Sequence, residues 1–226
     1  MVPGEDGRGR WWARRPSPTG TTTLRRVDHA TMVLEGRRVS LRPLTDADFP
    51  AWSAVRTRAR DWLVRWEPRP AGSPPLAEDR ASFASRCAAR ERERQLGVGF
   101  GFGIFVGERF CGEITLSSIQ RGPLQTGTIG YWIDEAVAGQ GLMPESVCVV
   151  LRFAFEDLSL HRIEIAIIPR NQPSRRVVEK LGIRFEGVAE RMLEIDGVWE
   201  DHARYAITSE EWLQRGPALV EDWIGA

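Results

Sequence analysis

Residues 127–146 have the sequence GTIGYWIDEAVAGQGLMPES. Its first eight residues alternate and predict a strand, and Pro144 suits the first turn of a following helix. A helix that begins just after a strand points its free amides at the strand's carboxyl end, where they bind anions. Gly139 and Gly141 lack a Cβ, so the backbone can approach a ligand closely. The stretch therefore predicts an anion site on the amides of Gln140, Gly141, Leu142 and Met143.

Two nucleotide-binding motifs also contain paired glycines, and this stretch fits neither. A Walker loop needs a Lys and a Ser or Thr directly after its last glycine, whereas Leu142 follows Gly141. A dinucleotide fingerprint needs a third glycine, where this chain has Pro144. It also needs an acidic residue about 20 positions on, where Leu160 and His161 stand. A turn without a ligand explains two glycines equally well, so this alternative stays open.

The rest of the chain predicts an α/β (α+β) fold. The expected elements, in order, are a strand at 37–44, helices from a Thr45–Asp48 capping box to Gly97, a hairpin over 98–119, the strand at 127–134, a helix, a strand at 161–168, a helix ending at Gly182, two strands around 195–197, and a short last helix capped by Ser209. The strand–helix–strand unit over 127–168 predicts a parallel pair. The expected sheet is mixed, mostly antiparallel, with six to seven strands and flanking helices.

A second polar cluster follows the strand predicted at 161–168. The sequence PRNQPSRRVVEKLG places Asn171 and Ser174 where a loop becomes a helix, beside the first motif if the crossover is parallel. Together the motifs resemble the GNAT acetyltransferase superfamily, in particular the branch that acetylates the N-terminal amine of ribosomal proteins. The resemblance covers residues 33–213. The matching residues are Gly139, Gly141, Glu145, His161 to Glu164, Asn171, Ser174, Leu181 to Gly187, Gly197, Asp201 and Tyr205.

Two positions depart from the superfamily pattern. Ala136 stands where Gln or Arg often opens the loop, and Val178 stands where many members carry a general-acid tyrosine. The N-terminal acetylase branch commonly lacks that tyrosine, and the serine of its N-x-x-S motif is then suspected of serving the leaving group. Ser174 is the matching residue.

The resemblance implies that an amine attacks acetyl-CoA directly, in a ternary complex and without a metal. It places the pyrophosphate on the loop amides, pantetheine between the strand ending at Asp134 and the one starting at Arg162, and the thioester oxygen near the amide of Ile133. Asn171, Ser174 and Arg176 complete the expected cofactor contacts. Simpler roles stay open for these three residues, namely a turn end, a helix N-cap and a solvated helix face.

The general base is the least determined part of the expected site. Glu113 and Glu194 are candidates, and each could equally be a structural carboxylate. An α-amine has a pKa of about 7.8, so about a third of it is neutral at pH 7.5, whereas only about 0.1% of a lysine side chain is. An α-amine acceptor therefore needs little help from a base.

Composition narrows the class of protein. The chain has 31 basic and 31 acidic residues, so no overall charge favours sequence-specific nucleic acid or an anionic membrane. Cys87, Cys111 and Cys148 are far apart and odd in number, which excludes metal-ligand spacing and favours free thiols in the cytoplasm. No run of 18 apolar residues predicts a membrane span.

The chain divides into two predicted parts. Residues 1–31 contain six arginines and three acidic residues without an apolar period, and we expect a disordered basic tail or an upstream extension. A nucleic-acid or ribosome-binding arm is the alternative. Residues 32–226 are expected to form one N-acetyltransferase domain. Within it, Trp62 and Trp66 lie four apart, a spacing that favours a core position over a ligand platform.

The expected acceptor is a protein N-terminus, with a small amine as the alternative. A CoA-binding, ribosome-associated factor with little catalysis is a third possibility, and the basic tail motivates it. Monomer and homodimer both stay open.

Overall fold

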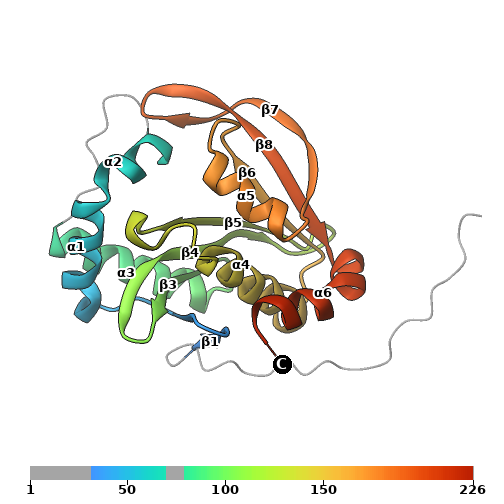
Figure 1. The fold of residues 1–226 in the computed structure, drawn as a ribbon, viewed down its shortest axis with the longest axis horizontal. Coiled ribbons are helices and arrows are strands. Elements are labelled where there is room, and N and C mark those ends of the chain that lie inside the picture. The colour runs from blue at the N-terminus through green and yellow to red at the C-terminus, as the bar shows by residue number, and fades with distance from the viewer. Residues whose placement is uncertain (1–31, 70–78, 226) are drawn as a thin grey trace, which may run out of the picture.

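The structure is a computed structural model that describes residues 32–69 and 79–225. A single eight-stranded sheet has the order β1-β2-β3-β4-β5-β6-β8-β7 (Figure 1). All neighbouring strands are antiparallel except β5 and β6, which are parallel, as the crossover over 127–168 predicts. The strands are β1 (Leu34–Glu35), β2 (Ser40–Arg42), β3 (Phe100–Val106), β4 (Arg109–Gln120), β5 (Thr126–Ile133), β6 (Arg162–Ile167), β7 (Arg184–Ile195) and β8 (Val198–Thr208).

Helices cover both faces of the sheet. On one face, the ring of Phe153, just after α4, makes edge contacts with Phe100 and Phe102 of β3. On the opposite face, Arg90 of α3 packs over Gly101, where an added Cβ would lie 3.1 Å from the arginine Cδ. The helices are α1 (Phe49–Arg58), α2 (Arg60–Leu63), α3 (Arg80–Gln95), α4 (Leu142–Arg152), α5 (Gln172–Lys180) and α6 (Ser209–Trp223).

Helix α4 is the centre of the main core. Every residue from Leu142 to Leu151 is buried, and Val147, Val150 and Leu151 of the predicted apolar period are fully so. Burying one such side chain contributes about 1.5–3 kcal/mol. The helix that carries the glycine loop at its start is therefore one of the most firmly packed elements of the protein.

Strands β5 and β6 pair over a short length. Their register runs from Thr126 opposite Arg162 to Thr128 opposite Glu164. Beyond Thr128, β5 continues its pairing with β4 as far as Ile133. The carboxyl ends of the two parallel strands therefore diverge, at the edge where the predicted site residues gather.

The structure differs from the sequence-based expectation in a few details. The strand count is eight because the two-residue strand β1 pairs with β2. Strand β2 ends before Pro43, which has no amide hydrogen for a ladder. Helix α6 is fifteen residues long, and its cap is Thr208 rather than Ser209, because the Thr208 hydroxyl accepts from the amide of Glu211.

Three further observations bear on the predictions. Cys87, Cys111 and Cys148 are free thiols. Within the described part of the chain, no helix is both long and apolar enough to cross a membrane. The tail predicted at 1–31 lies outside the described residues.

Candidate active site

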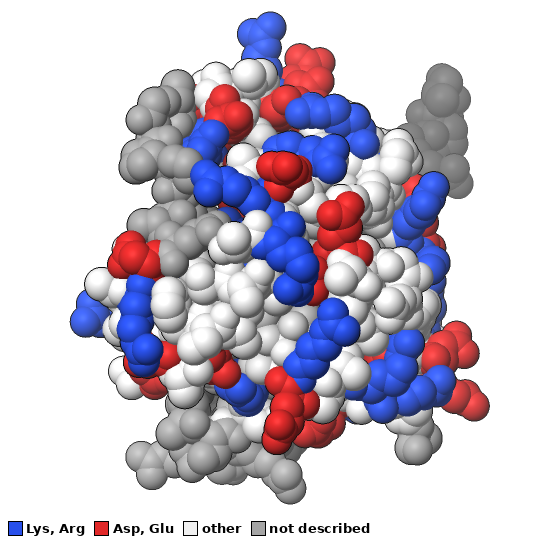
Figure 2. All heavy atoms as spheres, turned by 60° about the vertical axis from the view of Figure 1, so that its left-hand side comes forward, with Lys and Arg blue, Asp and Glu red and all other residues white. Residues whose placement is uncertain are grey.

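A cavity of about 800 Å³ lies where β5 and β6 diverge. Strands β4 and β5, helices α2 to α5 and the loop before α4 line it. The side of the molecule that Figure 2 brings forward carries basic and acidic side chains interspersed around uncharged surface. One end of the cavity is lined by Val137, Ala138, Gly139, Gly141, Leu142, Met143, Asn171, Ser174 and Arg176. These include most of the residues that the sequence predicts for the cofactor.

The loop before α4 has two positions that favour glycine. Gly139 and Gly141 have φ values of 78° and 83°, which L-residues with a side chain rarely adopt. Gly141 is the N-cap of α4 and has no side chain to cap the helix. The first amides of α4 are thus left for a ligand at the cavity wall, as an anion site needs.

An ion pair between the exposed Arg38 and the buried Glu145 braces this loop. Glu145, in the first turn of α4, is 1% exposed and accepts hydrogen bonds from the amides of Arg38 and Val39 at 2.5 and 3.0 Å. The Arg38 side chain donates to Glu145 at 2.9 Å and to the carbonyl oxygen of Gln140 at 2.9 Å. Gln140 therefore faces Arg38 and, unlike the other predicted loop residues, does not line the cavity.

Asp134 anchors the other end of the loop. It is fully buried and accepts from Arg58 Nη2 at 2.6 Å and from the amide of Ala136 at 3.2 Å. Its own amide donates to the carbonyl of Cys111 on β4 at 2.7 Å. The residue after β5 thus joins the loop to α1 and to the neighbouring strand.

The start of α5 brings two hydroxyl groups together. Asn171 is the N-cap, because its side chain accepts from the amide of Ser174 at 3.2 Å. Ser174 is therefore not the cap, the simpler role that the sequence left open. Its hydroxyl instead donates to the Tyr131 hydroxyl at 3.1 Å, and Tyr131 donates to the Ser174 carbonyl at 3.2 Å. Burial raises the pKa of Tyr131 above its ordinary value, so the phenol stays protonated.

Aromatic side chains line the other end of the cavity. Trp62 and Trp66 come from the segment of α2 and the turn after it, and Trp132 comes from β5. The core position expected for Trp62 and Trp66 is wrong: both are partly exposed and line the cavity. The guanidinium carbon of Arg170, in the turn after β6, lies 5.7 Å from the centre of the Trp66 ring. This contact joins the turn after α2 to the turn that follows β6.

Both acidic residues that line the aromatic end are paired. Glu113 of β4 lies opposite Trp132 and accepts from Trp52 Nε1 at 2.7 Å and Arg86 Nη2 at 3.1 Å. Glu67 pairs with the buried Arg56, with a second contact at 3.1 Å. The structure therefore brings the candidate base Glu113 to the cavity as an ion-paired carboxylate.

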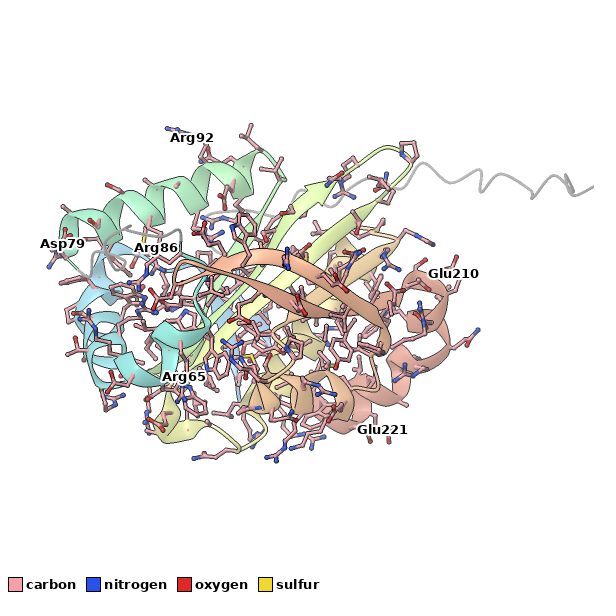
Figure 3. All side chains as sticks on the ribbon, turned by 90° about the horizontal axis from the view of Figure 1, so that it is seen from above. Arg65, Asp79, Arg86, Arg92, Glu210 and Glu221 are labelled. Carbon is pink, nitrogen blue, oxygen red and sulfur yellow. The ribbon has the colours of Figure 1, made fainter. Side chains whose placement is uncertain are left out.

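The tip of the β7–β8 hairpin contacts the segment beside the aromatic end. The hairpin crosses over β6 and α5, and its tip reaches the segment after α2 (Figures 1 and 3). There Pro68 forms a bridge with Ile195, and the amide of Arg69 donates to the carbonyl of Glu194 at 2.9 Å. Glu194 is not among the described residues that line the cavity. The structure does not bring this candidate base together with Glu113 and Ser174.

Sequence reasoning missed two functional candidates, Tyr131 and Arg38. Tyr131 had a usable signal, because residues two apart on a strand share a face and Ile133 was already placed at the site. Arg38 had none, since it precedes its partner Gln140 by 102 residues. Among residues 32–69 and 79–225, no group of three or more His, Cys, Asp and Glu side chains could hold a metal ion.

Known proteins share this architecture and its motifs. The profile of the acetyltransferase (GNAT) domain matches residues 38–184. "Probable N-acetyltransferase YjcK" of Bacillus subtilis is 36% identical over 79% of this chain and 98% of its own. The ribosomal protein uS5-alanine N-acetyltransferase of Escherichia coli is 34% identical over 45% of this chain and 52% of its own.

A solved structure with a bound cofactor is also similar. Mycobacterium smegmatis RimJ in complex with CoA-disulfide superposes with a TM-score of 0.77 and 33% identity. The superposition covers 84% of this chain and 92% of that one.

Proposed function

The chain belongs to the acetyltransferase (GNAT) family and is an N-acetyltransferase, and we propose that it acetylates the N-terminal α-amine of a protein of the ribosomal class, using acetyl-CoA. One observation carries the proposal. A single cavity joins the glycine loop, the Ser174–Tyr131 hydroxyl pair and an aromatic end lined by Trp62, Trp66 and Trp132. The similarity to the uS5-alanine N-acetyltransferase suggests the acceptor class.

The glycine loop fits the pyrophosphate of CoA. Gly139 and Gly141 both have positive φ and line the cavity, and a Cβ at Gly139 would meet nothing within 4 Å, so that side of the loop is open. The amides of Leu142 and Met143 would hold the phosphates, with Arg176 nearby as a cationic contact. Asn171 holds the first turn of α5 in place at the same end.

Acetyl-CoA supplies a thioester: the acceptor nitrogen bonds to the carbonyl carbon, the carbon–sulfur bond breaks, and the sulfur takes a proton. The amide of Ile133 at the end of β5 would donate to the carbonyl oxygen. To give a hydrogen bond to the sulfur as it leaves, Ser174 would turn its one hydroxyl hydrogen away from Tyr131, whose phenol could then donate to Ser174 Oγ instead of to the Ser174 carbonyl. The hydroxyls of Ser174 and Tyr131 would thus take the place of the general-acid tyrosine that many family members carry where this chain has Val178.

Glu113 serves best as a positioning carboxylate in this scheme. Its two hydrogen bonds hold the carboxylate in place beside Trp132, where it can order a water that takes the amine proton. An α-amine with a pKa of about 7.8 needs no stronger base at neutral pH.

Acetyl transfer from acetyl-CoA to defined amines tests the proposal. The purified protein is incubated with peptides that carry ribosomal-protein N-termini, with the same peptides blocked at the α-amine, and with polyamines and aminoglycosides. We expect a mass increase of one acetyl group, located at the α-amine by fragmentation, on the unblocked peptides. Acetylation of the blocked peptides at lysine, or of the small amines alone, would contradict it.

A further inference from the structure

Among the described residues, more arginines than acidic residues line the aromatic end of the cavity. Its two acidic residues, Glu67 and Glu113, are each matched by an arginine, Arg56 and Arg86. Arg90 lines the same wall in addition, and its partner Glu93 is not among the described residues that line the cavity. A second cationic group on an acceptor would therefore meet cations rather than free carboxylates.

Arg86 and Arg90 lie one helical turn apart on the inner side of α3. Figure 3 shows Arg92, on the same helix, pointing away from the rest of the molecule, whereas Arg86 lies toward the sheet. Arg90 can lie flat on β3 because the residue beneath it, Gly101, has no Cβ. Both guanidinium groups are partly buried and line the cavity.

A chain of contacts connects this pair to the reacting end. Arg86 donates to Glu113, and Glu113 lies directly opposite Trp132, the residue before Ile133. Opposite residues on antiparallel strands have Cα atoms about 5 Å apart. The arginines are thus within a few side-chain lengths of the thioester position of the proposed function.

The arginines have donors to spare. A guanidinium carries five N–H groups. Arg86 uses one on Glu113, and Arg90 uses one on Glu93 at 3.0 Å. The remaining donors suit a planar, bidentate acceptor such as a carboxylate.

We propose that Arg86 and Arg90 form a subsite for a carboxylate that the acceptor carries close to its reactive amine. The inference rests on the proposed function and narrows its substrate: peptides with an acidic residue near the N-terminus are favoured, and those with basic residues there are rejected. Like charges brought together in a partly buried site oppose binding of the wrong substrate.

Paired peptides test the subsite. Two peptides share an N-terminal Ala and differ in residues two to four, which are Glu in one and Lys in the other; free glutamate is a third acceptor. We expect kcat/KM to be about tenfold or more higher for the Glu peptide than for the Lys peptide. Peptide binding is also measured in the presence of CoA, which has no acetyl group to transfer, from the change in tryptophan fluorescence. We expect the Glu peptide to bind more tightly than the Lys peptide.

Variants on one helix provide the controls. Arg86→Gln and Arg90→Gln should each reduce the ratio between the two peptides severalfold, Arg86→Lys should retain most of it, and Arg92→Gln should leave it unchanged. CoA affinity reports whether each variant is folded. Equal or better use of the Lys peptide by the wild type would overturn the subsite and leave the transferase intact.

The binding readout separates the two proposals. A preference for the Glu peptide in binding, without acetyl transfer, would support the subsite and contradict the proposed function. Faster acetylation of free glutamate than of either peptide would keep the carboxylate subsite and overturn the protein acceptor.

Discussion

The two ends of the cavity are built from different parts of the chain. At the loop end, the proposed ligand contacts are mainly backbone amides, on a loop that two glycines shape and that the buried Glu145 supports. At the aromatic end, the groups are side chains from α2, α3 and β4, held by ion pairs such as that of Arg86 with Glu113.

This difference suits the two ligands of the proposed reaction. A backbone site depends on φ and on helix position, so it suits a cofactor whose phosphates are the same in every reaction. A side-chain site can change with a single substitution, so it suits an acceptor that differs between relatives. Substitutions at one end should therefore leave the other end unchanged.

The largest effect is expected at the loop end. Gly141→Val should weaken CoA binding about a hundredfold, because a left-handed φ costs about 1–2 kcal/mol for a residue with a Cβ and distorts the donors to a charged group. Titration calorimetry measures the change. Gly122→Ala, also at positive φ but in the β4–β5 turn, controls for strain alone. A CoA affinity within threefold of wild type would show that the amides do not form the site.

The second-largest effect is expected at the Ser174–Tyr131 hydroxyl pair. Ser174→Ala should lower kcat about thirtyfold, less than a typical general acid, because a thiol with a pKa of about 8.5 leaves readily. Tyr131→Phe should lower kcat less, since it removes the supporting hydroxyl only. Single-turnover kinetics with the CoA affinity measured alongside is the test. A loss of CoA affinity with unchanged chemistry would assign Ser174 to binding.

The third effect is confined to the aromatic end. Trp66→Ala should raise the KM for a peptide acceptor about tenfold, since a tryptophan contributes a large apolar contact area. CoA affinity should not change. Trp199→Ala, an equal truncation at an exposed position on the hairpin outside the cavity lining, is the matched control. If both variants behave alike, the cavity wall at Trp66 does not contact the acceptor.

The smallest effect is on stability in acid. Hydrogen bonds from Arg162 and Arg184 hold the pKa of Glu186, at the base of the hairpin, at about 2, below its ordinary value of 4.5. A lowered pKa in the folded state means that this contribution is complete above pH 4.5 and is lost as the pH falls toward 2.

Between pH 4.5 and pH 2 the unfolding free energy of Glu186→Gln should therefore fall by about 1 kcal/mol less than that of the wild type. The difference is small because partly exposed ion pairs contribute little. Denaturant titrations at several pH values measure it, with the exposed Glu190→Gln as control. Identical acid profiles for Glu186→Gln and wild type would mean that ion pairs do not hold the hairpin.

Local sequence determined much of the fold and the loop end of the site. The alternation of β5, the period of α4 and the glycines between them are all contained in residues 126–152, so short-range rules suffice for them. Asn171 and Ser174 follow from the motif after β6. The cap of α6 was misplaced by one residue because Thr208 and Ser209 both suit an N-cap, and only the contact with Glu211 distinguishes them.

Tertiary structure alone decided the aromatic end and the supports of the loop. The spacing of Trp62 and Trp66 is the same for a core face and for a cavity wall, and only the position of α2 over the diverging strands selects the wall. Arg38 meets Gln140, and Trp52 and Arg86 meet Glu113, across long stretches of chain. The sequence by itself thus determines where the backbone can bind a phosphate, because φ and helix starts are local properties. Which side chains surround the acceptor depends on packing between distant elements, and this is settled only when the sheet, α2, α3 and the hairpin come together.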